Sequence, residues 1–310
     1  MITEKQEIKN LIKSAIPTIL MTRINFMNWR LYVQDLPFKV YSGLTGALSC
    51  VKFSGNQESR RVGKWRDKMI DHLGGVQAQK DYLNTMGDFG TILHEATVRM
   101  WRDGKLNWKE EQDYAYEYFK LSAINNHIEP NDIVIRQQIF EYCKNAASIM
   151  AFIHQEVDDI YAIESMAKCD EIDIATPIDM VVKLKDKRIV TINIKTSEQI
   201  ANAHREQISV EKYLWNKTYD TQAHTTGILR PKNWMLSKVP TYEFLTLKPD
   251  EENKYLQSAL NRLKLAKNDE ENTYLTYPKE TVIFTGETKL GENPTMETKT
   301  LEQIYKGNIS

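Results

Sequence analysis

Residues 176–196, which read TPIDMVVKL-KDK-RIVTINIKT, constrain the fold of this chain more than any other segment. Apolar and polar side chains alternate on both sides of the short turn KDK, and successive side chains of a strand point to opposite faces. We therefore expect two antiparallel strands joined by a tight turn. Asp179 lies near the start of the first strand, and Asn193 and Lys195 lie near the end of the second. The hairpin would bring all three to one end of a sheet.

The segments around this hairpin indicate an α/β protein. Helices are expected over residues 5–21, 88–103 (with Asp88 as its N-cap), 108–125, 207–226 and 249–267. Strands are expected over residues 132–142 and 160–169 and twice within 227–248. The expected organisation is a mainly helical part (1–130) that forms one wall of a cleft, an α/β core (131–267) and a polar tail (268–310), together one compact unit.

Composition limits the kinds of partner. The 310 residues carry a net charge of −1, so a nucleic-acid-binding surface must be local. Cys50, Cys143 and Cys169 are far apart and form no CxxC, which favours a reducing, cytoplasmic setting over disulfides or a thiolate zinc site. The first ten residues lack the apolar core of a signal peptide, and no apolar run approaches the roughly 20 residues of a membrane span.

The polar residues of the hairpin suit metal-assisted hydrolysis of a phosphodiester. Such a site needs hard oxygen ligands for Mg²⁺ and a cation that steadies charge on the phosphate. Asp179 and Asn193 would supply the oxygens, and Lys195 would supply the cation. His94, on an expected helix, would add a nitrogen, which suits Mn²⁺ better than Mg²⁺. Glu164, on an upstream strand, would add another oxygen or hold a bound water.

An ordinary structural role fits the same residues. Asp, Asn and Lys on one strand face usually mark a solvated face, and a lone His beside an apolar helical stripe is usually a core or boundary residue. The order of the segments favours the functional interpretation. A helix with GxxxH precedes a strand with Glu, then the pair ID, then IKTS.

This order resembles the RecB-like branch of the PD-(D/E)XK nuclease superfamily, and most of all phage exonucleases and the mitochondrial genome maintenance exonuclease. The motifs that carry the resemblance span roughly residues 40–247 and are YSGLTGALS, KWRDKM, GDFGTILH, AIES, TPIDMVV, TINIKTSEQ and YDTQAHTTGIL. The resemblance implies a central mixed sheet flanked by helices. It also implies that His94, Asp179 and the residue at position 193 bind metal with the backbone carbonyl of Ile194, and that Lys195 is catalytic.

Three positions bear on how far the family pattern extends. A Gln that supports the site in the family would be Gln222, although the aromatic residue that often follows it is absent. Thr176 stands where a Gly commonly precedes the hairpin Asp, and Asn193 stands in place of the second acid. An amide oxygen is neutral and a weaker ligand for a hard dication. Two origins fit Asn193: a naturally attenuated site, or an Asp→Asn change that traps a complex.

The resemblance implies a Mg²⁺- or Mn²⁺-dependent DNA exonuclease that favours single-stranded ends. A basic cluster would grip the DNA phosphates while its tryptophan stacks on a base; it comprises Arg60, Arg61, Lys64, Trp65 and Arg66. A solvated helix face with the tryptophan in the core fits the cluster equally well. Two other interpretations remain: a catalytically inactive nuclease-fold protein that binds DNA or assembles with partners, and a structural protein without a nucleic-acid role.

Overall fold

The structure is a computed structural model. It describes residues 21–26, 29–35, 39–49, 70–71, 75–197, 200–232, 240–268, 280–285 and 295–307. Within these residues, no helix combines the length and the apolar character that crossing a membrane requires.

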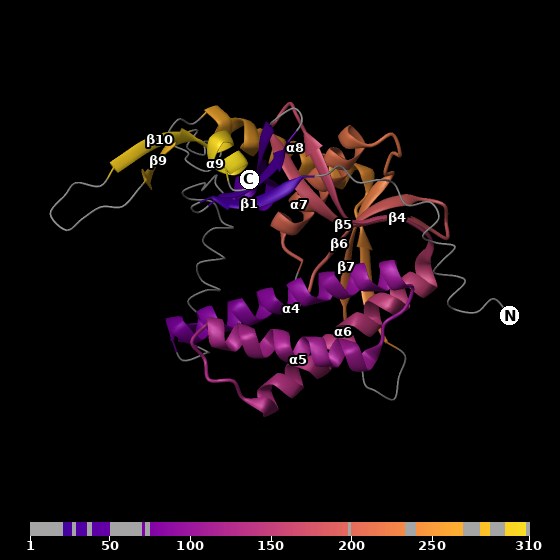
Figure 1. Ribbon diagram of the computed structural model, residues 1–310. Coiled ribbons are helices and arrows are strands. Elements are labelled where there is room, and N and C mark those ends of the chain that lie inside the picture. Colours follow the sequence, from indigo (N-terminus) through magenta and orange to yellow (C-terminus); the bar gives the residue numbers. More distant parts are fainter. Residues whose placement is uncertain are drawn as a thin grey trace.

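One mixed sheet of eight strands organises the described residues (Figure 1). Its strands are β1 (Thr22–Phe26), β2 (Trp29–Gln34), β3 (Lys39–Gly43), β4 (Val157–Cys169), β5 (Ile174–Leu184), β6 (Ile189–Ile194), β7 (Thr225–Pro231) and β8 (Tyr242–Thr246). Their order is β1-β2-β3-β5-β6-β7-β8, and β4 pairs with β5. The expected hairpin is confirmed, because β5 and β6 are antiparallel with Met180 opposite Ile192. The expected α/β class is confirmed as well.

Strand β5 has one edge that changes partner along its length. β4 pairs with the opposite edge from Ile174 to Leu184. The remaining edge pairs in parallel with β3 at residues 174–175 and antiparallel with β6 at residues 180–183. In the described part of the chain, residues 176–179 lie between these two pairings and have no strand partner on that edge. Asp179 is in this gap.

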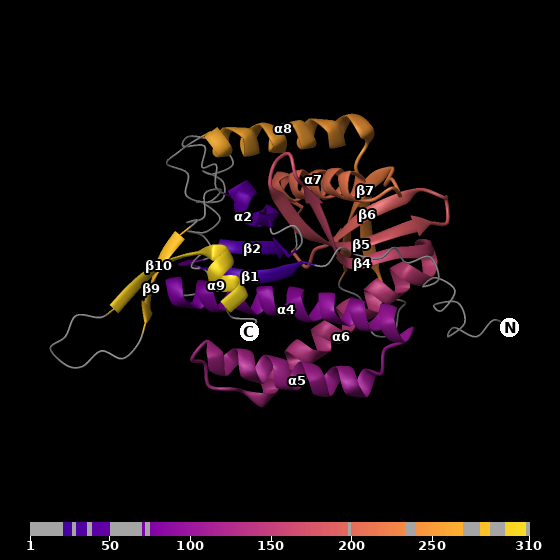
Figure 2. The same cartoon turned by 45° about the horizontal axis from the view of Figure 1, so that its top comes forward.

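Helices cover both faces of the sheet (Figure 2). On one face lie α4 (Val76–Asp103), α5 (Trp108–Asn125) and α6 (Asp132–Glu156), packed against apolar side chains of β4, β5 and β6. On the other face lie α2 (Leu44–Ser49), α7 (Asn202–Thr218) and α8 (Pro249–Asn268), which form a second core with β4 and β5. Because both faces are covered, the central strands are buried on both sides.

Two predictions for the helical layer are wrong, one about the type of an element and one about where a helix begins. Residues 132–142 are the start of α6 and not a strand, because Asn131 caps the helix and Ile135, Ile139 and Tyr142 recur at helical spacing on its buried face. Helix α4 begins at Val76, well before Asp88, so Asp88 is no N-cap. Its side chain instead accepts a hydrogen bond from Ser122 of α5.

Strands occur at both ends of the chain where the sequence predicted none. β1, β2 and β3 extend the main sheet into the part expected to be mainly helical. Leu31, Tyr32 and Val33 of β2 are all buried, so this strand lacks the alternation that marks a half-exposed strand. In the C-terminal part, β9 (Glu280–Thr285) pairs with β10 (Thr295–Thr300), and α9 (Leu301–Gly307) follows. The helix expected over residues 5–21 lies almost entirely outside the described residues.

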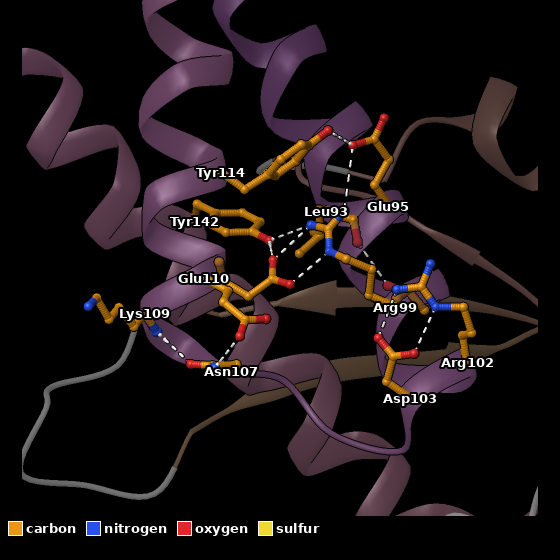
Figure 3. Close-up of polar contacts among 12 residues, drawn as sticks. Leu93, Glu95, Arg99, Arg102, Asp103, Asn107, Lys109, Glu110, Tyr114 and Tyr142 are labelled. Atoms are coloured by element: carbon orange, nitrogen blue, oxygen red, sulfur yellow. Dashed lines mark hydrogen bonds and ion pairs between the residues drawn. The ribbon is translucent and has the colours of Figure 1, made fainter.

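A polar network ties α4 to its two neighbouring helices (Figure 3). Arg99 of α4 donates to both carboxylate oxygens of Glu111, each at 2.7 Å, and to the hydroxyl of Tyr142 at 3.2 Å. Its guanidinium lies 4.4 Å from the centroid of the Tyr114 ring. The buried ion pair with its aromatic partners fixes α4 against α5 and α6. The helix that carries His94 is therefore held by side-chain contacts to both of its neighbouring helices.

Candidate metal and catalytic site

A cavity of about 720 Å³ opens where β5 and β6 meet α4, α7 and the strands β2 and β3. His94 of α4, Glu164 of β4 and Asp179 of β5 converge in it, and one potential ligand atom from each lies within 4.8 Å of the others. Nδ1 of His94 is 2.6 Å from Oε1 of Glu164 and 3.6 Å from Oδ1 of Asp179. Two carboxylates that follow His94 by 70 or more positions in the sequence thus lie beside its imidazole.

The backbone explains how Glu164 reaches Asp179. Ile163 pairs with Met180 and Ser165 with Ile178, so Glu164 lies opposite Asp179 across the two strands. Glu164 has a φ of 49°, in the left-handed region that a side chain with a Cβ rarely adopts. Such a conformation costs roughly 1–3 kcal/mol and is often found at functional sites.

Burial and neighbouring charges shift the proton affinities of this cluster. Burial raises the pKa of Asp179 to about 6, although His94, the Ile194 N–H and Lys195 oppose that rise. The Ile194 amide donates to Oδ2 of Asp179 at 2.7 Å. Burial alone would lower the pKa of His94, but Asp179 and Glu164 raise it to about 9. Without a cation, the cluster therefore retains protons that a metal ion would displace.

Asn193 is buried, and among the described residues only the nitrogen of its side-chain amide is hydrogen-bonded. Its side chain is on the strand face opposite Ile192, as expected, but this face is not solvated: Thr191 and Asn193 are each 2% exposed, because α7 covers them. Nδ2 of Asn193 donates to both carboxylate oxygens of Glu211, at 3.0 and 3.1 Å. Oδ1 of Asn193 is buried and has no hydrogen-bond partner among the described residues. Buried polar atoms nearly always have a hydrogen-bond partner, so this oxygen is available to bind a donor or a cation.

A hydrogen-bonded chain links the lysine to Asn193. Nζ of Lys195 donates to Oε1 of Gln207 at 3.1 Å, and Nε2 of Gln207 donates to Oε1 of Glu211 at 2.7 Å. Burial, helped by the charge of Asp179, raises the pKa of Glu211 to about 8. The sequence interpretation missed Gln207 and Glu211. Their spacing of four residues on an expected helix, which places both on one face, was the available signal.

Two predicted groups are not part of this cavity as described: one residue lies away from it, and one cluster falls outside the described residues. Gln222 lies in the loop between α7 and β7 and does not line the cavity; its exposed side chain donates to the carbonyls of Asn216 and Tyr219 at the end of α7. Gln207, by contrast, lines the cavity and accepts a hydrogen bond from Lys195. The basic cluster at residues 60–66 lies outside the described residues, so its contact with DNA stays a prediction.

The residues present fit a divalent cation. Imidazole and carboxylate ligands from His94, Glu164 and Asp179 suit Mn²⁺, and the oxygen-rich set also suits Mg²⁺. The unpaired Oδ1 of Asn193 adds a neutral oxygen. Ile194 lines the same cavity, and the role of its carbonyl as a ligand stays a prediction.

Comparison with known proteins does not assign the chain to a family. No family model and no curated protein matches it. Among solved structures, a protein described as SSO0001 is similar over 49% of this chain and 69% of its own length, with 13% identity and a TM-score of 0.25.

Proposed function

We propose that the protein is a Mg²⁺- or Mn²⁺-dependent nuclease of the PD-(D/E)XK type that hydrolyses phosphodiester bonds of DNA. The observation that carries the proposal is the convergence of His94, Glu164 and Asp179 in a cavity that Lys195 also lines. The arrangement β4-β5-β6-α7-β7, with the acidic residues beside the β5–β6 hairpin, supports the assignment to this fold type.

His94, Glu164, Asp179 and Asn193 would hold the metal ion. A bound ion would polarise the phosphate and lower the pKa of a water molecule. Glu164 orients the imidazole of His94, and the Ile194 amide fixes the carboxylate of Asp179. These contacts hold the ligands in place before substrate arrives, which reduces the reorganisation that binding requires.

Lys195 would act on the phosphate. Gln207 holds its ammonium at 3.1 Å, and the side chain remains partly exposed to the cavity. A fixed cation stabilises negative charge as it develops on the phosphate oxygens, and it can also orient the attacking water. Arg30 of β2 lines the cavity as well and would bind a neighbouring phosphate of the strand. The preference for single-stranded ends rests on the motif resemblance.

Asn193 supports a second candidate function. If the neutral amide leaves the site without enough charge to bind a metal ion, the protein would bind DNA or assemble with partners without cutting it. This candidate predicts salt-dependent DNA binding together with little affinity for Mn²⁺.

Cleavage of end-labelled oligonucleotides tests the proposal. We expect single-stranded DNA to be degraded with Mn²⁺ or Mg²⁺, no degradation with a chelator, and loss of activity in Asp179→Asn, which keeps an acceptor for the Ile194 amide. Binding without metal-dependent cleavage of either single- or double-stranded DNA would instead favour the second candidate.

A further inference from the structure

Glu211 differs from the other buried glutamates of the described residues. Glu111 pairs with Arg99, Glu206 with Arg262, and Glu252 with Lys212. Glu211 is 2% exposed, yet its hydrogen-bond partners among the described residues are the neutral amides of Asn193 and Gln207. No Lys, Arg or His nitrogen lies within 4.0 Å of its carboxylate in the described part of the chain. A buried carboxylate is costly without a counter-charge, so this group lacks the partner that its environment requires.

The position of Glu211 points to where that counter-charge belongs. Its side chain lines the same cavity as Asp179 and Asn193, and Oδ1 of Asn193 has no hydrogen-bond partner among the described residues. Both hydrogen bonds from Nδ2 of Asn193 end on Glu211, so this carboxylate decides which way the amide faces and leaves Oδ1 free. Within the described residues, a buried acid without a cationic partner thus contacts an amide whose oxygen has no donor.

We propose that Glu211 is the second acid of the metal site. Its carboxylate, supplied by helix α7, provides the negative charge that strand β6 lacks at position 193, and it holds the Asn193 oxygen ready for the cation. The inference rests on the proposed metal-dependent function and adds a residue to it. A structural carboxylate would be expected to have a cationic side chain like those of the other three glutamates.

This assignment also explains the amide at position 193. An Asp there would place a second carboxylate about 3 Å from Glu211, as its Nδ2 contacts of 3.0 and 3.1 Å indicate. Two buried carboxylates at that separation cannot both ionise without a cation between them. Asn193 and Glu211 therefore form a complementary pair. The amide is on strand β6, where the nuclease pattern has an acid, and the acid is on helix α7. With the acid on α7, the amide at position 193 requires neither a naturally attenuated metal site nor an Asp→Asn change.

A charge-exchange series tests the inference by calorimetric titration with Mn²⁺. Glu211→Gln keeps the shape of the side chain and should weaken binding by ~10–100-fold, the usual effect of removing a group that supports a metal site. The double variant N193D/E211Q returns one carboxylate to β6 and should recover most of the affinity. Glu206→Gln, a buried glutamate on the same helix paired with Arg262, is the matched control and should bind Mn²⁺ like the unmodified protein. Thermal melting without metal reports folding of each variant.

The outcomes separate this inference from the proposed function. If Asp179→Asn abolishes Mn²⁺ binding while Glu211→Gln leaves it unchanged, the metal site stands and Glu211 is structural. If Glu211→Gln fails to fold, the double variant decides, because weak binding by a folded N193D/E211Q protein would also overturn the inference. If the unmodified protein binds no Mn²⁺ at all, the proposed function itself fails.

Discussion

Each polar side chain in the cavity has an environment that sets its chemistry. Asp179 keeps one oxygen on the Ile194 amide and the other near His94, so its orientation is fixed from two sides. Lys195 has a neutral partner in Gln207, which holds the ammonium without neutralising it. A cation that is positioned but not paired with a carboxylate is suited to stabilise charge on a substrate.

Lys195→Ala should reduce the cleavage rate by ~10²–10³-fold, the usual effect of removing one group that stabilises the transition state. Mn²⁺ affinity should change little, because the lysine is no ligand. Lys183→Ala, on the adjacent strand and paired with Asp158, is the matched control. Rates on a labelled oligonucleotide and melting temperatures should be measured together. Undiminished cleavage would remove Lys195 from the mechanism.

The stability of the metal-free protein should fall as pH rises. Burial raises the pKa of Glu211 from 4.5 to about 8, so between these values the folded state holds a proton that the unfolded chain has released. Stability is therefore largest below the unfolded pKa and is lost as pH rises through the folded one. His94, raised from 6.5 to about 9, acts with the same sign over a higher range.

Urea unfolding in a chelator from pH 5 to pH 8 measures this dependence. Glu211→Gln removes the titrating carboxyl and should flatten the fall in stability over this range. Parallel curves for the two proteins would show that Glu211 does not retain its proton in the folded state.

At the scale of single elements, strand β4 bears backbone strain where it presents Glu164. The φ of 49° places this residue in the left-handed region, where only glycine is free of a Cβ penalty. Glu164→Gly should therefore be more stable than Glu164→Ala by about 1 kcal/mol, since only alanine retains the penalty. Both variants lose the carboxylate and should bind Mn²⁺ more weakly. Equal stability of the two would argue against strain at this position.

The sequence predicted local elements better than the relations between them. The β5–β6 hairpin was recognised because its alternation and its turn lie within 21 consecutive residues. It brought Asp179, Asn193 and Lys195 together correctly. Glu211 was missed because its contact with Asn193 depends on how α7 packs over β6, whereas its four-residue spacing from Gln207 indicates only a shared helix face. The buried strand β2 was missed for a related reason: a strand covered on both faces shows no alternation.

At the scale of the whole molecule, the sheet continues from the core into the N-terminal strands, so the cavity has a β-sheet wall as well as helical ones. Arg30 of β2 adds a second positive charge, beside that of Lys195, to a cavity that several carboxylates line. The net charge of −1 makes such local cations necessary for binding DNA.

Binding of single-stranded DNA should weaken steeply with salt, and Arg30→Ala should lower the log–log slope by ~0.7, as expected for one lost phosphate contact. Arg102→Ala is the matched control, because Arg102 is an exposed arginine of α4 paired with Asp103 outside the cavity. Fluorescence anisotropy at several salt concentrations, in a chelator to prevent cleavage, gives the slopes. Equal slopes for both variants would place the DNA backbone away from β2.

The central claim is that His94, Glu164 and Asp179 bind one divalent cation in the cavity beside Asn193. Anomalous diffraction at the manganese edge, from crystals soaked in Mn²⁺, tests it most directly. We predict one strong anomalous peak in this cavity, within about 2.5 Å of oxygen or nitrogen atoms of these side chains, and no peak there in crystals of Asp179→Asn. A fully soaked crystal with no manganese in the cavity, or with manganese only at exposed carboxylates elsewhere, would contradict the account.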